Sequence, residues 1–481
     1  MTTSDLTSTH PSVPDAALEA YLDATHEQRL ESYKEFLRIP SISALSEHAA
    51  DCRAAATWLA DALAGAGAEH VEVSESTGHP VVYADWLHAE GAPTVVVYGH
   101  YDVQPVDPLD LWTSPPFEPV IVGDRMLGRG AADDKGQVHL HVVALEGLLK
   151  TRGSLPVNVK YVFEGDEEFE SAHLDTWLEA NRGRLAADVA VISDTGFFDG
   201  NLPAITVSLR GICYIQIDVE GTALDLHSGQ FGGAVENPAN ALAQIIAALK
   251  GPDGRIRVPG FYDDVVPLGD AERAALAELP FDEEAYRESL GLPALAGEVG
   301  FTTLERRGTR PTLDVNGIWG GFQGEGSKTI IPAHAHAKVS CRLVADQDPD
   351  RIFERLEAYI AEVAPPGVRT TVRKLGTGRP SLMPIDHPAT QAAARALAAT
   401  FRRDPVFIRE GGSIPVGASF ESRLGLPVVL LGFTPPDDNA HAPNESMLLA
   451  NYEGGIRAIA RMWSELAAIA TAKSPGSDGT R

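Results

Sequence analysis

The chain has few cysteines, and those it has cannot build a cross-linked framework. Cys52, Cys213 and Cys341 are the only three among 481 residues, and they are scattered and odd in number. This leaves neither a set of disulfides nor a paired-cysteine metal knuckle. Proteins of reducing compartments commonly have this pattern. We therefore expect a cytoplasmic protein with free thiols.

Positive charge and long apolar runs are also scarce. There are 39 lysines and arginines against 67 aspartates and glutamates, so the formal net charge is −28. Such a chain is repelled by nucleic acid and by anionic membrane surfaces. No run approaches the roughly 20 apolar residues of a membrane-spanning helix, and the first residues lack the basic start and apolar core of a signal peptide. We expect neither a nucleic acid nor a membrane as partner.

The hydrophobic content, 44% of the chain, is that of an ordinary globular protein, and the length favours more than one domain. Up to about residue 206, short apolar strands alternate with helical patterns, as in an α/β fold with a mostly parallel sheet and helices on both faces. From there "ITVSLRGICYIQIDVEG" has the pattern of one long alternating strand. The strand and helix texture of the first part returns after residue 383. We expect one sheet domain, 1–206 and 384–481, with a smaller α+β domain, 207–383, inserted into it.

Polar residues follow the apolar runs where each predicted strand ends. In open α/β sheets, ligands bind beyond the carboxyl ends of the strands. A Gly-flanked pair, Asp133 and Asp134, also precedes a predicted helix in "GRGAADDKG". The residues at strand ends are His100 and Asp102 after "TVVVYG", Glu167 and Glu168 after "NVKYVFEGD", Asp194 after "DVAVIS", and His441 in the loop after "LPVVLLGF".

Histidines and carboxylates at one sheet edge predict a metal centre. This is the ligand set of Zn²⁺ or Mn²⁺, and several carboxylates suit two divalent ions about 3.5 to 4 Å apart. The acidic run "EGDEEFES" at 164–171 would then face cations that cancel its repulsion. Two other histidine pairs are not expected to bind metal. His334 and His336 share a strand face without a carboxylate set, and His139 and His141 lie two apart on a helix.

The motifs "GHYDVQP", "GRGAADDKG", "EGDEEFES", "ISDT" and "NAHAPNES", in this order, resemble the dinuclear metallopeptidases that include cytosolic non-specific dipeptidase, carnosinase, carboxypeptidase G and aminoacylase. "DLHSGQFGG", "SCRLV" and "REGGSIP" extend the resemblance over nearly the full length. The resemblance implies a catalytic sheet domain with an inserted lid and dimerisation domain. It also implies a dipeptidase that uses two divalent metal ions, Zn²⁺ or Mn²⁺.

By this resemblance, Asp133 bridges the two metals. His100 and Asp194 complete one site, and Glu168 and His441 complete the other. Glu167 is implied to be the general base that takes a proton from the water bridging the metals and passes it to the leaving amine. Asp102 is implied to orient the imidazole of His100, and the peptide bond before Asp134 is implied to be cis.

The resemblance also assigns residues to substrate binding. His227 of "DLHSG" is implied to reach across a homodimer and stabilise the oxyanion. Arg342 of "SCRLV" would clamp a free substrate carboxylate. Ser413 of "EGGSIP" and Thr329 of "KTIIP" would add hydrogen bonds to the substrate.

The alternatives share most of this machinery. An amidohydrolase of N-acyl amino acids or a carboxypeptidase would keep the metals and the base and differ in its pocket. The long stretch between Gly251 and Gly326 and the "LRGICY" wording favour the dipeptidase and carnosinase branch. A non-catalytic peptide-binding relative would be expected to lack the base or a ligand, and this sequence retains them all.

Overall fold

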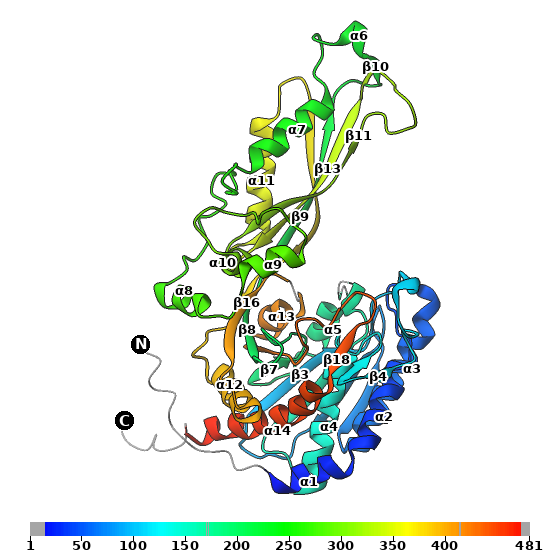
Figure 1. Ribbon diagram of the computed structural model, residues 1–481, viewed down its shortest axis with the longest axis vertical. Coiled ribbons are helices and arrows are strands. Elements are labelled where there is room, and N and C mark those ends of the chain that lie inside the picture. The colour runs from blue at the N-terminus through cyan, green and yellow to red at the C-terminus, as the bar shows by residue number, and fades with distance from the viewer. Residues whose placement is uncertain (1–14, 170, 172, 413–414, 473–481) are drawn as a thin grey trace. The chain divides into compact units, whose positions relative to one another are not determined.

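The computed structural model describes residues 15–169, 171, 173–412 and 415–472 (Figure 1). The chain divides into two compact units. Unit 1 is Met1–Val207, Met383–Phe407 and Ser419–Arg481, and unit 2 is Ser208–Leu382 and Ile408–Ala418.

The main sheet of unit 1 has a parallel centre and antiparallel edges. Four neighbouring strands run parallel: β6 (Asn158–Glu164), β3 (Thr94–His100), β7 (Val189–Ile192) and β17 (Val428–Leu431). One edge adds the antiparallel strands β2 (Val81–Trp86) and β1 (Glu69–Ser74). The other edge continues as β8 (Ala204–Leu209), which begins in unit 1 and also pairs with β15 (Ser381–Leu382) and β16 (Val406–Glu410).

Helices cover both faces of this sheet because its central strands are apolar on both sides. Val95 and Val97 of β3 join a core with α3 (Ala49–Ala66), α4 (Lys135–Arg152), α12 (Pro388–Phe401) and α14 (Leu449–Ala472). Tyr98 points to the other face and meets the ring of Phe420 at 5.7 Å, beside α5 (Leu174–Ala180). The predicted α/β fold class is therefore confirmed.

The helical segment at residues 16–37 is interrupted near its middle. It forms two helices, α1 (Ala16–Ala24) and α2 (His26–Leu37), because Thr25 leaves the helical conformation with φ −108° and ψ 9°. The Thr25 hydroxyl donates a hydrogen bond to the carbonyl of Tyr21 at 2.8 Å, which ends α1.

A small three-stranded sheet in unit 1 joins two segments that carry motifs. Its order is β18 (Ser446–Leu448), β5 (Arg125–Leu127) and β4 (Val120–Val122), with Ser446 opposite Leu127. This pairing places the end of "NAHAPNES" beside the start of "GRGAADDKG".

Unit 2 is an antiparallel sheet in the order β11 (Thr312–Gly320), β13 (His334–Leu343), β9 (Gly211–Glu220) and β14 (Arg369–Gly378). Alternate residues of β9, from Cys213 to Val219, pack against α7 (Pro238–Leu249) and α11 (Pro349–Val363). The prediction of one continuous strand over "ITVSLRGICYIQIDVEG" is therefore wrong, since this segment forms two strands, β8 and β9, that lie in different sheets. A Cβ on Gly211 would lie 2.5 Å from the carbonyl oxygen of Gly378, so the chain needs glycine at this break.

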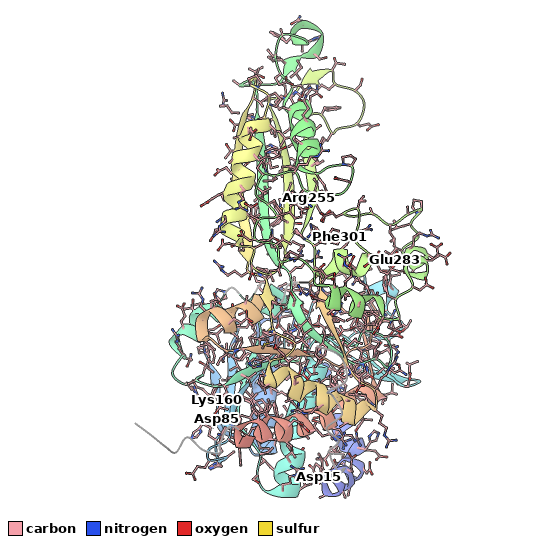
Figure 2. The ribbon with its side chains drawn as sticks, turned by 90° about the vertical axis from the view of Figure 1, so that its left-hand side faces the viewer. Asp15, Asp85, Lys160, Arg255, Glu283 and Phe301 are labelled. Carbon is pink, nitrogen blue, oxygen red and sulfur yellow. The ribbon has the colours of Figure 1, made fainter. Side chains whose placement is uncertain are left out.

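The stretch after α7, which has weak periodicity, holds three short helices: α8 (Asp270–Ala277), α9 (Glu283–Ser289) and α10 (Thr303–Gly308). Charged side chains hold it together (Figure 2). Arg255 and Arg310 donate hydrogen bonds to Glu298 at 2.9 and 2.8 Å, and Arg310 lies over the ring of Phe301 at 4.3 Å. Glu283 accepts a hydrogen bond from the backbone N–H of Thr303 at 2.8 Å.

The three cysteines are buried and unlinked, as predicted. Among the described helices, none combines the length and apolar character needed to cross a membrane.

Candidate metal centre

The residues predicted at strand ends lie together in unit 1. The four central strands are parallel, so their carboxyl ends share one edge. His100 is the last residue of β3, the 3₁₀ turn Glu167–Phe169 follows β6, and Asp194 follows β7 by two residues. Asp133 precedes α4, and His441 lies in the loop between β17 and β18.

Five side chains form two groups that share one carboxylate. The first group is His100, Asp133 and Asp194, and the second is Asp133, Glu168 and His441. Within each group, one ligand atom from every residue lies within 4.8 Å of the others. Asp133 Oδ1 is 3.1 Å from His100 Nε2, and its Oδ2 is 2.9 Å from His441 Nε2. The carboxylate of Asp133 thus directs one oxygen to each group.

The orientation of His100 depends on Asp102. Both side chains are fully buried, and His100 Nδ1 lies 3.3 Å from Asp102 Oδ1 and 3.2 Å from its carbonyl oxygen. This holds Nε2 towards Asp133. The other oxygen of Asp102 accepts a hydrogen bond from the backbone N–H of Glu168 at 3.0 Å. Asp102 therefore connects a histidine of the first group to a carboxylate of the second.

The raised pKa values in the two ligand groups indicate that added positive charge stabilises them. Burial opposes a charge on His100, but its hydrogen bonds to Asp102 and Asp133 raise its pKa well above the usual value. Hydrogen bonds to Asp133 and Glu168 raise the pKa of His441 to about 10. Burial raises the pKa of Asp194 well above its usual value, and the charge of Asp133 adds to the effect. Two divalent cations would supply the positive charge that these protons provide.

Glu167 lies beside the groups but belongs to neither. Burial raises its pKa to about 7, and the neighbouring charges of Asp133, Asp102 and Glu168 act in the same direction, against His100. A carboxyl with a pKa near neutrality can both accept and return a proton at physiological pH.

Two imidazoles and three carboxylates fit two divalent ions with one bridging carboxylate, and Zn²⁺ and Mn²⁺ both accept this donor set. The peptide bond between Asp133 and Asp134 is cis, as the resemblance implied. Sequence reasoning missed Gln104, whose side-chain amide donates to Glu168 Oε2 at 2.7 Å. Its place inside the motif "GHYDVQP" was the available signal.

In unit 2 the structure brings two predicted residues together. His227 pairs with Ile330 in the two-stranded sheet of β10 (Leu226–His227) and β12 (Ile330–Ile331). The N–H and the hydroxyl of Ser228 both donate to the carbonyl of Thr329 at 3.1 Å. The backbone N–H of Gly229 donates to His227 Nδ1 at 3.0 Å. The neutral ring of His227 therefore carries its proton on Nε2, as a hydrogen-bond donor.

Arg342 lies at the other end of unit 2. It occupies β13 opposite Thr312 and Ile212, eight residues along the strand from His334. A second arginine that the sequence analysis did not single out, Arg210, lies near it. Burial lowers the pKa of Arg210 to about 10, and repulsion from Arg342 contributes. Two guanidinium groups in one region favour an anion there. Ser413 lies outside the described residues.

The histidine pairs set aside from the sequence have other partners. His336 Nδ1 lies 2.6 Å from Asp218 Oδ1, and its ring stacks on Trp319. His139 contacts the hydroxyl of Tyr452 at 2.8 Å, and His141 contacts that of Ser193 at 2.8 Å.

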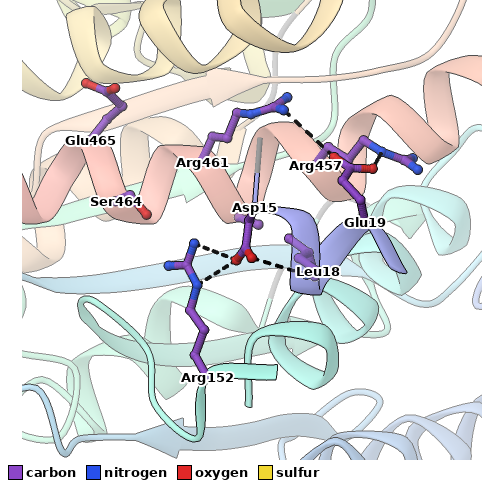
Figure 3. Close-up of a pocket in the computed structure, with 9 residues that line it drawn as sticks. Asp15, Leu18, Glu19, Arg152, Arg457, Arg461, Ser464 and Glu465 are labelled. Atoms are coloured by element: carbon purple, nitrogen blue, oxygen red, sulfur yellow. Dashed lines mark hydrogen bonds and ion pairs between the residues drawn. The ribbon is translucent and has the colours of Figure 1, made fainter. Parts of the chain in front are cut away.

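Unit 1 also has a surface pocket of about 160 Å³ (Figure 3) that none of the candidate ligands lines. Its arginines are paired with carboxylates. Arg152 lies 2.7 Å from Asp15, and Arg457 lies 2.7 Å from Glu19. The pocket lies where α1 meets the end of α4 and the middle of α14, and its lining arginines serve to join these helices.

Histidines and carboxylates at the carboxyl edge of an α/β sheet are typical of metal-dependent hydrolases. Residues 96–465 match the model of peptidase family M20/M25/M40. The chain is 34% identical over 396 residues to the Cys-Gly metallodipeptidase dug1 of Schizosaccharomyces pombe, covering 81% of this chain and 83% of that protein. It is 30% identical over 481 residues to the human Beta-Ala-His dipeptidase, covering 95% and 94%.

Among solved structures, the M20 family metallo-carboxypeptidase Sso-CP2 of Sulfolobus solfataricus matches with a TM-score of 0.81 and 32% identity, covering 92% of this chain and 99% of that one. The chain belongs to peptidase family M20/M25/M40. The family predicted from the motifs is confirmed, and so is the class of enzyme, a metallopeptidase.

Proposed function

We propose that this metal-dependent dipeptidase holds two divalent cations with His100, Asp133, Glu168, Asp194 and His441. The observation that carries the proposal is the placement of the two oxygens of Asp133, one towards each histidine. Such ions, when bound, would polarise the scissile carbonyl and make water a nucleophile near neutral pH. Both Zn²⁺ and Mn²⁺ remain candidates, because the donor set suits either ion.

Glu167 is the proposed general base. It lies next to both groups without contributing to either, so its carboxylate stays available for proton transfer. With a pKa of about 7, it can take a proton from the attacking water and then give it to the leaving amine. Asp102 holds His100 in place and does not itself take part in the transfer.

Arg342 is the proposed clamp for the free carboxylate of the substrate. A guanidinium forms two parallel hydrogen bonds with a carboxylate, and Arg210 adds positive charge to the same region. Ser413 and Thr329 are proposed to donate hydrogen bonds to the substrate. In this scheme 1–206 and 384–481 form the catalytic domain, and 207–383 form the lid and dimerisation domain.

We propose that His227 acts in the active site of a partner subunit in a homodimer. The eight residues of extended strand between His334 and Arg342 span about 26 Å, since each residue rises about 3.3 Å. His227 lies beyond the His334 end, where Asp225 accepts a hydrogen bond from Ala333 N–H. A dipeptide spans only about 7 Å. His227 and Arg342 of one chain therefore cannot both touch one dipeptide.

The substrate is proposed to be a free dipeptide. Relatives of this chain are named for Cys-Gly and β-Ala-His dipeptides, but one similar structure is a metallo-carboxypeptidase. N-acyl amino acids and longer peptides are therefore the competing substrates. A cytoplasmic location, predicted from the free cysteines, belongs to the same proposal.

A substrate panel tests this function. The metal-free protein is supplied with Zn²⁺ or Mn²⁺ and assayed with free dipeptides, dipeptide amides, N-acetyl amino acids and tetrapeptides. We expect turnover only with metal, and fastest with free dipeptides. Preferential release of C-terminal residues from tetrapeptides would assign a carboxypeptidase, and preferential deacetylation would assign an amidohydrolase. Binding of the peptides without turnover would identify a non-catalytic relative.

A further inference from the structure

Glu445, the penultimate residue of "NAHAPNES", is a buried carboxylate that grips the loop carrying Asp133. Its side chain is completely buried. Oε1 accepts hydrogen bonds from the backbone N–H groups of Ala132 at 2.8 Å and Asp133 at 3.0 Å. Oε2 accepts from the N–H of Gly130 at 3.0 Å. One carboxylate thus satisfies three backbone donors of a single turn.

Arg129 completes this arrangement from the same loop. Its side chain is also buried, and Nη1 donates to Glu445 Oε2 at 2.7 Å. Nη2 donates to the carbonyl of Pro105, in the segment that carries Gln104, at 3.1 Å. A buried ion pair is retained at a desolvation cost, and fixing one arrangement of a site is among the roles that such a pair can serve.

The position of Glu445 in the chain links two candidate ligands. Asp133 is shared by both ligand groups, and His441 stands only four residues before Glu445. His441 has a φ of 60°, a conformation that side chains rarely adopt and that its surroundings must hold. The backbone joins the same contact, because Gly128 N–H donates to the carbonyl of Glu445 at 3.0 Å.

We propose that Glu445 and Arg129 are a positioning pair that sets the distance between Asp133 and His441 and thereby the affinity for the metals. Neither residue is a metal ligand, and both act through the backbone of the shared ligand. This inference rests on the proposed two-metal function. Loss of partners that orient metal ligands typically lowers metal affinity by about 10- to 100-fold.

The test is Glu445→Gln in the full-length protein. Glutamine keeps the size but places an NH₂ group against backbone donors, and it leaves Arg129 without its counter-charge. Mn²⁺ is titrated calorimetrically into metal-free protein, and the melting temperature is recorded separately. We expect two sites in the native protein and, in the variant, an affinity lower by about 10- to 100-fold for at least one site. Turnover should recover when the Mn²⁺ concentration is raised by a similar factor, with KM little changed.

Glu453→Gln is the matched control. Glu453 of α14 accepts hydrogen bonds from Arg29 at 2.8 Å and Arg457 at 3.1 Å, so this change also breaks an arginine–glutamate pair in unit 1. It should lower the melting temperature and leave both Mn²⁺ affinities unchanged. If Glu445→Gln does the same, Glu445 supports only the fold and the positioning role is wrong.

If the Glu445→Gln protein does not fold, Arg129→Lys is a second variant that tests the positioning role. Lysine keeps the positive charge but lacks the guanidinium group, whose two nitrogens donate to Glu445 and to the carbonyl of Pro105. We expect a smaller loss of Mn²⁺ affinity, and a folded Arg129→Lys protein with native affinities would overturn the proposal. A native protein that binds neither Mn²⁺ nor Zn²⁺ would instead refute the proposed function itself.

Discussion

His227→Ala gives the strongest test of how the active site is assembled. His227 is exposed and presents an Nε2–H donor, and about 26 Å of strand separates its end of unit 2 from Arg342. Removing one oxyanion donor costs about 10² to 10³ in kcat, or roughly 2.7 to 4 kcal/mol of transition-state stabilisation. We expect a loss of this size in steady-state assays of a free dipeptide, with metal content unchanged. His334→Ala, which removes an exposed histidine of the same unit, should retain activity.

Mixing two inactive proteins then tells whether the histidine acts across subunits. With equal amounts of His227→Ala and Glu167→Gln and free exchange, about half of the dimers are mixed. In a mixed dimer the His227→Ala subunit has a native base and receives a native histidine from its partner. About one quarter of all sites should then be complete, so about a quarter of native activity should return.

Recovery of activity in the mixture distinguishes a histidine that acts across subunits from one that acts within its own subunit. If His227 served its own subunit, every site in every dimer would lack either the histidine or the base. No recovery, with subunit exchange demonstrated by co-purification of differently tagged chains, would therefore refute the reasoning from strand length.

Four further predictions concern metal, base, clamp and pH. Mn²⁺ at 100 times its Kd should stabilise the metal-free protein by about 2.7 kcal/mol for one site, seen as a higher melting temperature; no shift would contradict the metal centre. Glu167→Gln should retain two metals by elemental analysis and lose about 10² to 10⁴ in kcat; normal turnover would exclude it as the base. Arg342→Met should raise KM for free dipeptides by about 10- to 100-fold and spare dipeptide amides, and an equal effect on both would refute the clamp. Burial lowers the pKa of His139 and His141 to about 3, so between about pH 6.5 and pH 3 only the unfolded chain binds their protons. The free energy of unfolding should therefore fall between about pH 6.5 and pH 3, by about 2 kcal/mol for each histidine at pH 5. In urea unfolding at pH 7 and pH 5, the His141→Asn protein should show a difference in stability that is smaller by the contribution of one histidine.

The sequence predicted which side chains gather at the sheet edge, because the signal for that is local. Each candidate ligand follows an apolar run or a glycine-flanked turn, and parallel strands bring such positions to one edge whatever the details of packing. Local patterns did not predict where β8 ends and β9 begins, because the alternation of apolar residues continues through Arg210. The break depends on which sheet each half joins, and that is decided by distant partners such as Gly378.

The contacts of Glu445 could not be predicted from the sequence for the same reason. A glutamate in a loop that contains Pro and Asn has the pattern of a solvent-exposed residue. The backbone N–H groups that Glu445 binds lie more than 300 residues earlier in the chain. The spacing of the histidines at 139 and 141 predicted that they are not joint ligands. Their burial against Tyr452 and Ser193 could not be read from that spacing.

The acidic run at 164–171 shows how one local signal can have two causes. The sequence predicts that the run faces cations, and Glu167 and Glu168 lie at the candidate centre, while Glu170 lies outside the described residues. Glu164 is buried and accepts hydrogen bonds from Tyr98 at 2.5 Å and Ser171 at 2.8 Å. Burial raises its pKa to about 8, so it is largely protonated at neutral pH and adds little to the repulsion.

Asp166 is held differently, by the backbone N–H of His79 at 2.7 Å. The run therefore combines carboxyls that fix the loop with carboxylates that serve the proposed site. Glu164 is anchored at the end of β6, two residues before Asp166, and the turn that follows presents Glu167 and Glu168 side by side. Repulsion within the run is relieved in part by a proton on Glu164 and in part by hydrogen bonds, so the cations have only the remaining charge to offset.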